Sequence, residues 1–237
     1  MIGKVRLDNI LFLDIETVPL EDNFQKLDAE MQQLWDDKTK YQRRDEFTPE
    51  AFYDRAGIWA EFGKIVCISV GYFIIKGDIR NFRVTSFFGD ETKILRDFIN
   101  LLNNHFSQPQ HVLCGHNAKE FDIPFIARRM IINGVAIPEK INLFGKKPWE
   151  IQHLDTLELW KFGDYKHFTS LKLLTKILGI PSPKGDIDGS QVGHVFYVEK
   201  DIDRIVTYCE KDTIAVAQIF LRLRGDDLLV DDEIIHI

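Results

Sequence analysis

The sequence has few cysteines, no excess of positive charge and no long apolar run, and each shortage excludes a class of protein. Its 237 residues include only Cys67, Cys114 and Cys209, none at the spacing of a metal site or redox pair. We therefore expect reduced thiols in the core of a cytoplasmic protein, without a disulfide framework. The N-terminus lacks a signal-peptide pattern, and no apolar run is long enough to cross a bilayer, so no membrane partner is expected.

The charge balance limits how the chain can bind nucleic acid. The net charge is −7, from 37 acidic residues against 30 lysines and arginines. Binding over a wide surface needs basic charge that displaces counterions from phosphates, and this balance argues against it. It leaves open a local nucleic-acid site whose positive charge comes from bound metal ions. The apolar fraction of 45%, with eighteen phenylalanines, is ample for a core.

Hydrophobic periodicity predicts an α/β chain that forms a single domain over residues 1–237. The predicted strands are 10–18, 64–76, 81–88, 111–115 and 151–154, and the second and third of these form a hairpin. The predicted helices are 90–106, 119–133, 168–178 and 201–223. A polar helical excursion over 21–44 carries apolar residues at helical spacing, namely Phe24, Leu27, Met31 and Leu34. A hairpin followed by alternating strands and helices is typical of one mixed sheet flanked by helices.

The segment Ile10 to Val18, ILFLDIETV, places two carboxylates in one predicted strand. Because side chains alternate between the faces of a strand, Asp14 and Glu16 point the same way. Two carboxylates on one face of a core strand repel each other and are costly to desolvate. A divalent cation held by oxygen ligands would offset both costs. The alternative is one surface acid plus one capping acid at the strand end, and this segment alone favours neither.

Two further motifs follow downstream. In N-A-K-E-F-D, Asp122 lies at a predicted helix start, near the sheet edge where α/β sheets place their ligands. Taken alone, Asp122 is more simply explained by the preference of acids for the first turn of a helix. In Y-C-E-K-D, Tyr208 and Asp212 are four residues apart and share a helix face. The alternative there is a hydrogen bond that only stabilises the helix.

In order, D-I-E, N-x-x-x-F-D and Y-x-x-x-D resemble the three motifs of the DEDD superfamily of 3′→5′ exonucleases, in the subgroup with tyrosine in the last motif. The flanking segments resemble the bacterial stand-alone family related to the proofreading domain of family B DNA polymerases. These segments are FGKIVCIS at 62–69, HLDT at 153–156, KGDIDGS at 184–190 and YCEKD at 208–212. The resemblance covers nearly the whole chain. It implies a ribonuclease-H-like α/β fold, with a central mixed sheet and helices on both faces.

The resemblance also implies an activity, the metal-dependent hydrolysis of single-stranded DNA from its 3′ end with release of nucleoside 5′-monophosphates. Two Mg²⁺ or Mn²⁺ ions would catalyse the reaction. Asp14 would bridge both ions, Glu16 and Asp212 would lie nearer the attacking water, and Asp122 nearer the leaving group. Tyr208 would orient the water. Two alternatives stay open: the same reaction on RNA, and a non-catalytic nucleic-acid-binding module, against which the intact acids and Tyr208 count.

Four residues are weaker candidates for substrate binding. Thr17 would offer its backbone amide to the 3′ end, and Asn117 would bind substrate or simply cap the helix that holds Asp122. Phe121 would stack on a terminal base, although core packing is expected for at least one of Phe121 and Phe125. Asp155 resembles an additional acid of such sites, or caps a strand end. Solvated surface is the default for several lysines that could also meet phosphates, namely Lys146, Lys147, Lys161, Lys166 and Lys184.

Overall fold

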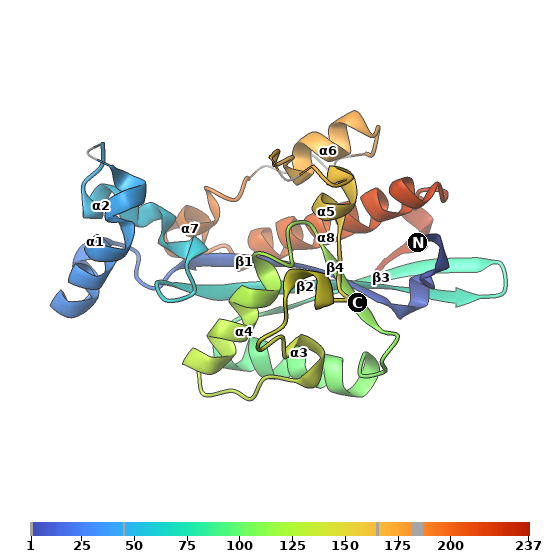
Figure 1. Cartoon of the computed structure of the whole chain (residues 1–237), viewed down its shortest axis with the longest axis horizontal. Helices are drawn as coiled ribbons and strands as arrows, with labels where there is room; N and C mark the ends of the chain where they lie inside the picture. Colours follow the sequence, from blue (N-terminus) through green and yellow to red (C-terminus); the bar gives the residue numbers. More distant parts are fainter. Residues whose placement is uncertain (1, 45, 165, 182–186) are drawn as a thin grey trace.

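The computed structural model of the chain describes residues 2–44, 46–164, 166–181 and 187–237. Its centre is a six-stranded mixed sheet in the order β5-β4-β1-β2-β3-β6 (Figure 1). The strands are β1 Ile10–Pro19, β2 Gly63–Lys76, β3 Ile79–Phe88, β4 Val112–Gly115, β5 Leu154–Asp155 and β6 Ile234–His236. β1 pairs antiparallel with β2 and parallel with β4, so it lies inside the sheet with a neighbour of each kind. The predicted mixed sheet is confirmed.

Helices cover both faces of this sheet, as expected. The long helix α8 lies on one face, and α3 and α4 lie on the other (Figure 1). The helices are α1 Ala29–Arg43, α2 Pro49–Phe52, α3 Glu91–His105, α4 Asp122–Ile132, α5 Thr156–Lys161, α6 Leu171–Ile177, α7 Val192–His194 and α8 Ile202–Arg224. Within the described ranges, none of them combines the length and apolar character that a membrane span requires.

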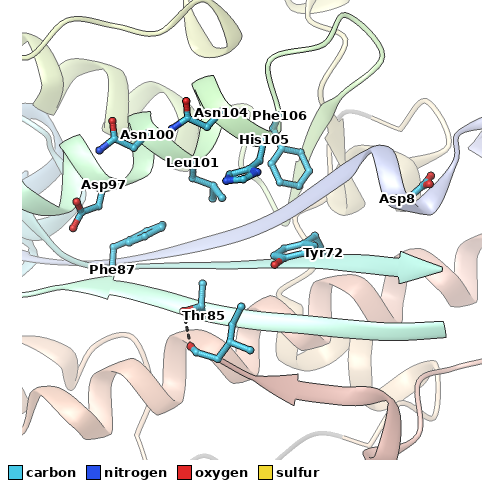
Figure 2. A pocket seen from close by; sticks show the side chains of 11 residues that line it. Asp8, Tyr72, Thr85, Phe87, Asp97, Asn100, Leu101, Asn104, His105 and Phe106 are labelled. Carbon is cyan, nitrogen blue, oxygen red and sulfur yellow. Dashed lines mark hydrogen bonds between the residues drawn. The ribbon is translucent and has the colours of Figure 1, made fainter. Parts of the chain in front are cut away.

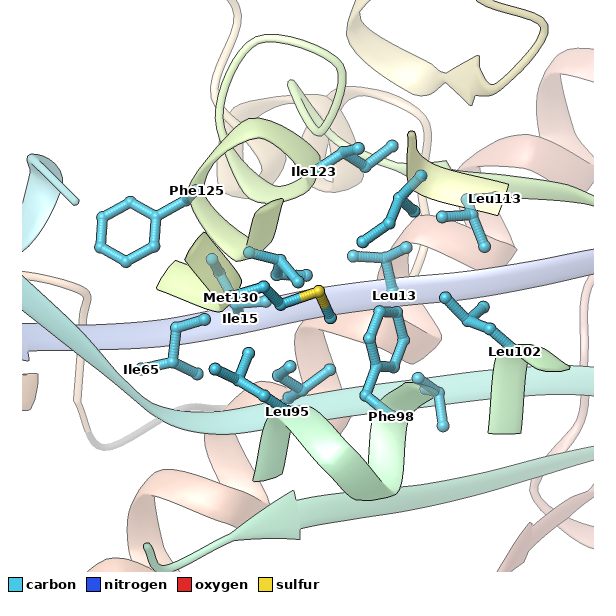
Figure 3. Packing of buried hydrophobic residues seen from close by; sticks show 14 of the residues in the cluster. Leu13, Ile15, Ile65, Leu95, Phe98, Leu102, Leu113, Ile123, Phe125 and Met130 are labelled. Carbon is cyan, nitrogen blue, oxygen red and sulfur yellow. The ribbon is translucent and has the colours of Figure 1, made fainter. Parts of the chain in front are cut away.

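The alternation of side chains along β1 explains how the two helical layers attach to it. Leu13 and Ile15 point into the cluster formed with α3 and α4, where Leu95 and Phe98 pack against them (Figure 3). Ile10 and Phe12 point the other way and pack with residues of α8. Phe12 meets the ring of Phe220 on α8 edge-on, with ring centroids 5.7 Å apart. Residues 14 and 16 continue this second row, so the strand pattern directs them toward α8.

Three elements have boundaries that differ from those the periodic pattern predicts, because of local sequence signals. Helix α4 begins at Asp122 and not at residue 119, because the preceding turn contains Asn117 in the left-handed region, with φ 65°. Helix α6 begins at Leu171, where the side chain of Ser170 accepts a hydrogen bond from the amide of Leu173. The strand expected at 151–154 is only Leu154–Asp155. The sequence analysis did not predict α5 and β6, which are six and three residues long.

The helical excursion after β1 starts later than expected and buries a different side chain. Asp28 caps α1, accepting a hydrogen bond from the amide of Met31, so the helix begins at Ala29. Leu34, expected on the buried face, is 48% exposed, whereas Trp35 is fully buried. Trp35 packs against an aromatic cluster that includes Phe52, Tyr53 and Phe62. Lys184, Gly185 and Asp186 of the KGDIDGS segment lie outside the described residues.

Candidate active site

Strand β1 and helix α8 bring the first and third sequence motifs together. Cys209 lies under Asp14, with its Sγ 3.4 Å from the Asp14 carbonyl oxygen and 3.5 Å from Asp14 Oδ2. One turn further along α8, Asp212 accepts a hydrogen bond from the hydroxyl of Tyr208. The charge of Asp212 acts on both Asp14 and Glu16. Asp14 and Glu16, two residues apart in β1, thus face Tyr208 and Asp212, four residues apart in α8.

Asp122 enters the same cluster through a gap between two strands. The pairing of β1 with β4 ends at Phe12 opposite Cys114, and β1 then continues alone on that side. The chain turns back after Gly115, where a Cβ would lie 2.4 Å from that of Ala118, so only glycine permits this close turn. Helix α4 therefore starts beside the unpaired part of β1, and the backbone of Ile15 donates a hydrogen bond to the Asp122 carboxylate. Asp122 thus lies where ligands bind in such sheets, beyond the carboxyl ends of parallel strands.

The electrostatics of the cluster are those of acids without a counter-charge. Burial, followed by the charges of Asp122, Asp212 and Glu16, raises the pKa of Asp14 well above its ordinary value. Burial and the charge of Asp212 do the same to the pKa of Glu16. Burial raises the pKa of Asp122 to about 7 and that of Asp212 to about 6. Each carboxylate is thus destabilised in its charged form, which a bound cation would reverse.

The donor set fits a hard divalent cation. Four carboxylates supply oxygen ligands, the type that Mg²⁺ and Mn²⁺ prefer. Glu16 is only 7% exposed, and Asp122 only 4%. Ligand atoms of Asp14 and Glu16, together with the Cys209 sulfur, lie within 4.8 Å of one another. Asp14, Glu16, Asp122 and Asp212 are therefore the residues that would hold such an ion.

A cleft of about 900 Å³ opens beside Glu16. Thr17 lines it, directly after a bulge at which the register between β1 and β2 shifts. The Thr17 hydroxyl donates to the carbonyl oxygen of Gly57 at 2.7 Å. A Cβ on Gly57 would lie 3.2 Å from the backbone of Val18, so the excursion packs tightly against the strand. The far walls of the cleft include Asp54, Arg55, Ile58, Gly193, His194 and Tyr197.

The weaker sequence candidates separate into two groups. Thr17 and the half-buried Phe121 line the cleft, whereas Phe125 is 1% exposed and belongs to the core. Asp155 accepts hydrogen bonds from the amides of Asn117 and Lys119 in the turn before α4, at 2.9 and 3.0 Å. It also caps α5, where it accepts hydrogen bonds from the backbone amides of residues 157 and 158. This carboxylate therefore fixes the turn that leads to Asp122, and the residue that precedes α4 as its cap is Phe121, not Asn117.

A second cleft, of about 560 Å³, lies between α3 and the β2–β3 hairpin. Its two acids, Asp8 and Asp97, lie at opposite ends of it (Figure 2). Asp97 is already paired with Lys93, with Nζ and Oδ2 2.6 Å apart. Tyr72, Phe87 and Leu101 supply much of the remaining wall. None of the four clustered acids is among the residues that line this cleft, whereas Glu16 lines the first one, which is therefore the candidate active site.

Sequence reasoning missed the residues that complete the cleft. Arg55, Gly57 and Ile58 come from a 3₁₀ helix, Tyr53–Ile58, that no periodic pattern marks. Gly193 and Tyr197 belong to α7 and the π-helix Val195–Glu199 after it. They contact a strand that is more than a hundred residues away in the sequence. The Tyr197 hydroxyl, for example, donates a hydrogen bond to the carbonyl oxygen of Pro19 in β1 at 2.5 Å.

A comparison with solved structures identifies the fold of the chain. The chain aligns with the family B DNA polymerase from the hyperthermophilic archaeon Pyrobaculum calidifontis with a TM-score of 0.55 and 15% identity. The alignment covers 90% of this chain, which spans only 24% of the polymerase chain. At that identity the likeness establishes the fold, a ribonuclease-H-like α/β domain similar to a polymerase exonuclease domain.

The family follows from the sequence match. A family model described as a predicted 3′-5′ exonuclease related to the exonuclease domain of PolB matches residues 58–231. The chain belongs to this family and is therefore an enzyme of the 3′-5′ exonuclease class, whose domains use divalent metals. The matched range contains Asp122, Tyr208 and Asp212, whereas Asp14 and Glu16 precede it. A comparison with curated proteins found no match.

Proposed function

We propose that the protein removes nucleotides one at a time from the 3′ end of single-stranded DNA, releasing nucleoside 5′-monophosphates. The observation that carries the proposal is the convergence of four buried or half-buried acids, without a cationic partner among the described residues, beside an open cleft. Two Mg²⁺ or Mn²⁺ ions held there by Asp14, Glu16, Asp122 and Asp212 would supply charge stabilisation and a more acidic water.

The chain's own residues have separate roles in this proposal. The Tyr208 hydroxyl, fixed against Asp212, orients the attacking water. The cleft accepts the terminal nucleotide, with Thr17 at its floor and Phe121 offering a ring face to the base. Asp155 is a positioning residue, because it holds the turn that places Asp122. The three free, buried thiols suit a reducing cytoplasm, which is where we place the protein.

Exposed aromatic side chains support a single-stranded substrate. Four aromatic side chains between residues 144 and 168 are among the most exposed of the described chain: Phe144 at 74%, Trp149 at 77%, Phe162 at 87% and Phe168 at 67%. Lys146, Lys147, Lys161 and Lys166 lie between them in sequence. Unpaired bases stack on such rings, and lysines meet the phosphates. Phe168 lies next to Thr169, whose carbonyl oxygen accepts a 2.8 Å hydrogen bond from His116 in the turn before Asp122.

The test is digestion of matched oligonucleotides labelled at the 5′ end. We expect single-stranded DNA to shorten progressively in Mg²⁺ or Mn²⁺ and to persist in EDTA. Asp14→Ala should lower the rate by about a thousandfold or more, since a ligand shared by both ions is lost. Asp97→Ala, which removes an acid of the second cleft, is the matched control and should keep full activity.

Each other outcome has a defined meaning. Faster digestion of RNA than of DNA of the same sequence would assign the enzyme as an exoribonuclease. Binding of both strands without any shortening would favour a non-catalytic nucleic-acid-binding module. An Asp14→Ala protein that, after purification from contaminating nucleases, still degrades DNA at the wild-type rate would refute the assignment of the acids.

A further inference from the structure

A thiol lies among the acids of the proposed active site, although ions that prefer oxygen ligands would not coordinate it. Cys209 Sγ is 3.5 Å from Asp14 Oδ2, and Cys209 is completely buried. One ligand atom each from Asp14, Glu16 and Cys209 lies within 4.8 Å of the other two. Mg²⁺ and Mn²⁺ take oxygen ligands and leave sulfur aside. The same three atoms suit an ion of a different class.

The separation of sulfur and oxygen matches the coordination of zinc. Zinc binds carboxylate oxygen at about 2.0 Å and cysteine sulfur at about 2.3 Å, usually as a tetrahedron. Two such ligands at the tetrahedral angle lie about 3.5 Å apart, which is the separation found between Cys209 Sγ and Asp14 Oδ2. The site therefore needs no change at this edge to accept the ion.

Glu16 gives an independent indication of a ligand at this position. Its side chain is more than nine-tenths buried, and it faces the same space as Asp14. The influences on its carboxylate are burial and the charges of Asp212, Cys67 and Asp122, and no hydrogen-bond donor acts on it among the described residues. A buried carboxylate without a donor is costly, and a cation is the partner that removes the cost.

We propose that Asp14, Glu16 and Cys209 form a binding site for Zn²⁺, or another thiophilic divalent ion, whose occupancy inhibits the exonuclease. The bound ion competes with Mg²⁺ or Mn²⁺ for Asp14 and Glu16. The sulfur ligand favours the thiophilic ion in this competition, because Mg²⁺ does not bind sulfur. On binding, the Cys209 S–H bond breaks, a zinc–sulfur bond forms, and the proton passes to water. No electron is transferred. The inhibitory role rests on the proposed function, whereas the binding site does not.

Cobalt is the spectroscopic probe, because Co²⁺ replaces zinc and a thiolate ligand gives it charge-transfer absorption in the near ultraviolet. We expect the full-length wild-type protein to show this absorption, and Cys209→Ser to lose it. Cys114→Ser, which changes a buried thiol of a different cluster, is the matched control and should keep the absorption. Asp14→Asn retains the thiol and should weaken cobalt binding.

A second measurement needs no variant. X-ray absorption at the cobalt edge of the wild-type protein should show one sulfur among oxygen neighbours. An all-oxygen environment at saturating Co²⁺, or an absorption unchanged in Cys209→Ser, would overturn the site.

The inhibitory role is tested with Zn²⁺ added to the Mg²⁺-dependent digestion. We expect inhibition that excess Mg²⁺ relieves, and a zinc concentration for half-inhibition about tenfold or more higher in Cys209→Ser, as loss of a ligand predicts. The two proposals fail in different ways. A protein that binds cobalt through sulfur but degrades no DNA contradicts the proposed function alone. A protein that degrades DNA with equal zinc sensitivity in wild type and Cys209→Ser contradicts the inhibitory site alone.

Discussion

Buried carboxylates occur in two places in this protein, at Glu91 and in the candidate active site, and they are stabilised in opposite ways. Glu91, the first residue of α3, accepts hydrogen bonds from Nε and from one terminal nitrogen of Arg129, at 2.8 and 2.6 Å. It also accepts from the amide of Ile65 at 2.7 Å and from the side chain of Asn133 at 3.0 Å. In the part of the chain that the structure describes, the acids of the candidate active site have no such cation, and the charges that act on Asp14 are those of other acids.

The difference separates a structural acid from a functional one. A buried ion pair is tolerated when its geometry is good and its remaining hydrogen-bonding atoms are satisfied, as for Glu91 with Arg129, whose side chains are 11% and 5% exposed. Arg129 also donates to the carbonyl oxygen of Ala60 at 2.8 Å, which joins α4 to the end of the excursion. At Asp14 and Glu16 the chain supplies negative charge and leaves the positive charge to come from solution.

The largest expected effect on stability comes from making the same substitution in both groups. Glu91→Gln leaves the buried Arg129 guanidinium unpaired, and we expect the free energy of unfolding to fall by about 3–5 kcal/mol. Glu16→Gln relieves repulsion between carboxylates, so in EDTA the free energy of unfolding should rise by about 1 kcal/mol. Urea denaturation of the two variants and the wild type measures both. Equal losses in both variants would contradict the distinction between the two groups.

A pH series should give the next largest effect. The pKa of Asp122 is about 7 in the folded protein against an ordinary 3.8, so the folded state keeps a proton that the unfolded state loses. Between these two values the unfolded state binds fewer protons, and the stability of the metal-free protein should therefore fall as pH rises. The shift of Asp212 has the same sign.

Urea denaturation from about pH 4 to pH 7 tests this, with Asp122→Asn as the reference that isolates one group. The fall should be smaller in Asp122→Asn than in the wild type. Mg²⁺ should reduce the fall or reverse it, because the ion binds the deprotonated carboxylates. The same pH dependence in EDTA and in saturating Mg²⁺ would show that these acids do not bind the ion.

Comparison of the acids also shows what the sequence alone could predict. The strand period placed Asp14 and Glu16 on one face, and the helix period placed Tyr208 and Asp212 on one face, because both rules act over a few residues. The hairpin and α8 were predicted for the same reason, with boundaries within two residues. The meeting of the acids of β1 with Tyr208 and Asp212 followed from the family resemblance and not from periodicity, and the order of the strands in the sheet was not predicted.

Features that depend on distant contacts were not predictable. Cys209 looked like a core thiol, and its position under Asp14 depends on how α8 crosses β1. Asp155 resembled an additional acid of the site or a strand-end cap, and its carboxylate accepts hydrogen bonds both from backbone amides of α5 and from those of the distant turn before α4. The walls of the cleft come from the excursion and from the π-helix, where chain packing and not a local pattern decides which residues meet.

The smallest expected change in stability comes from Tyr208→Phe, which removes the hydroxyl that donates to Asp212. Loss of one hydrogen bond should cost about 1 kcal/mol of unfolding free energy. If the hydroxyl also orients the attacking water, kcat should fall by about a hundredfold, at the low end for positioned proton-transfer groups. KM and the affinity for Mg²⁺ should change little, as for an interaction made mainly in the transition state. Urea denaturation and single-turnover digestion of one preparation separate the two roles. A slightly less stable protein with full activity would leave Tyr208 as a residue that stabilises α8, and the task of orienting the water would pass to the acids alone.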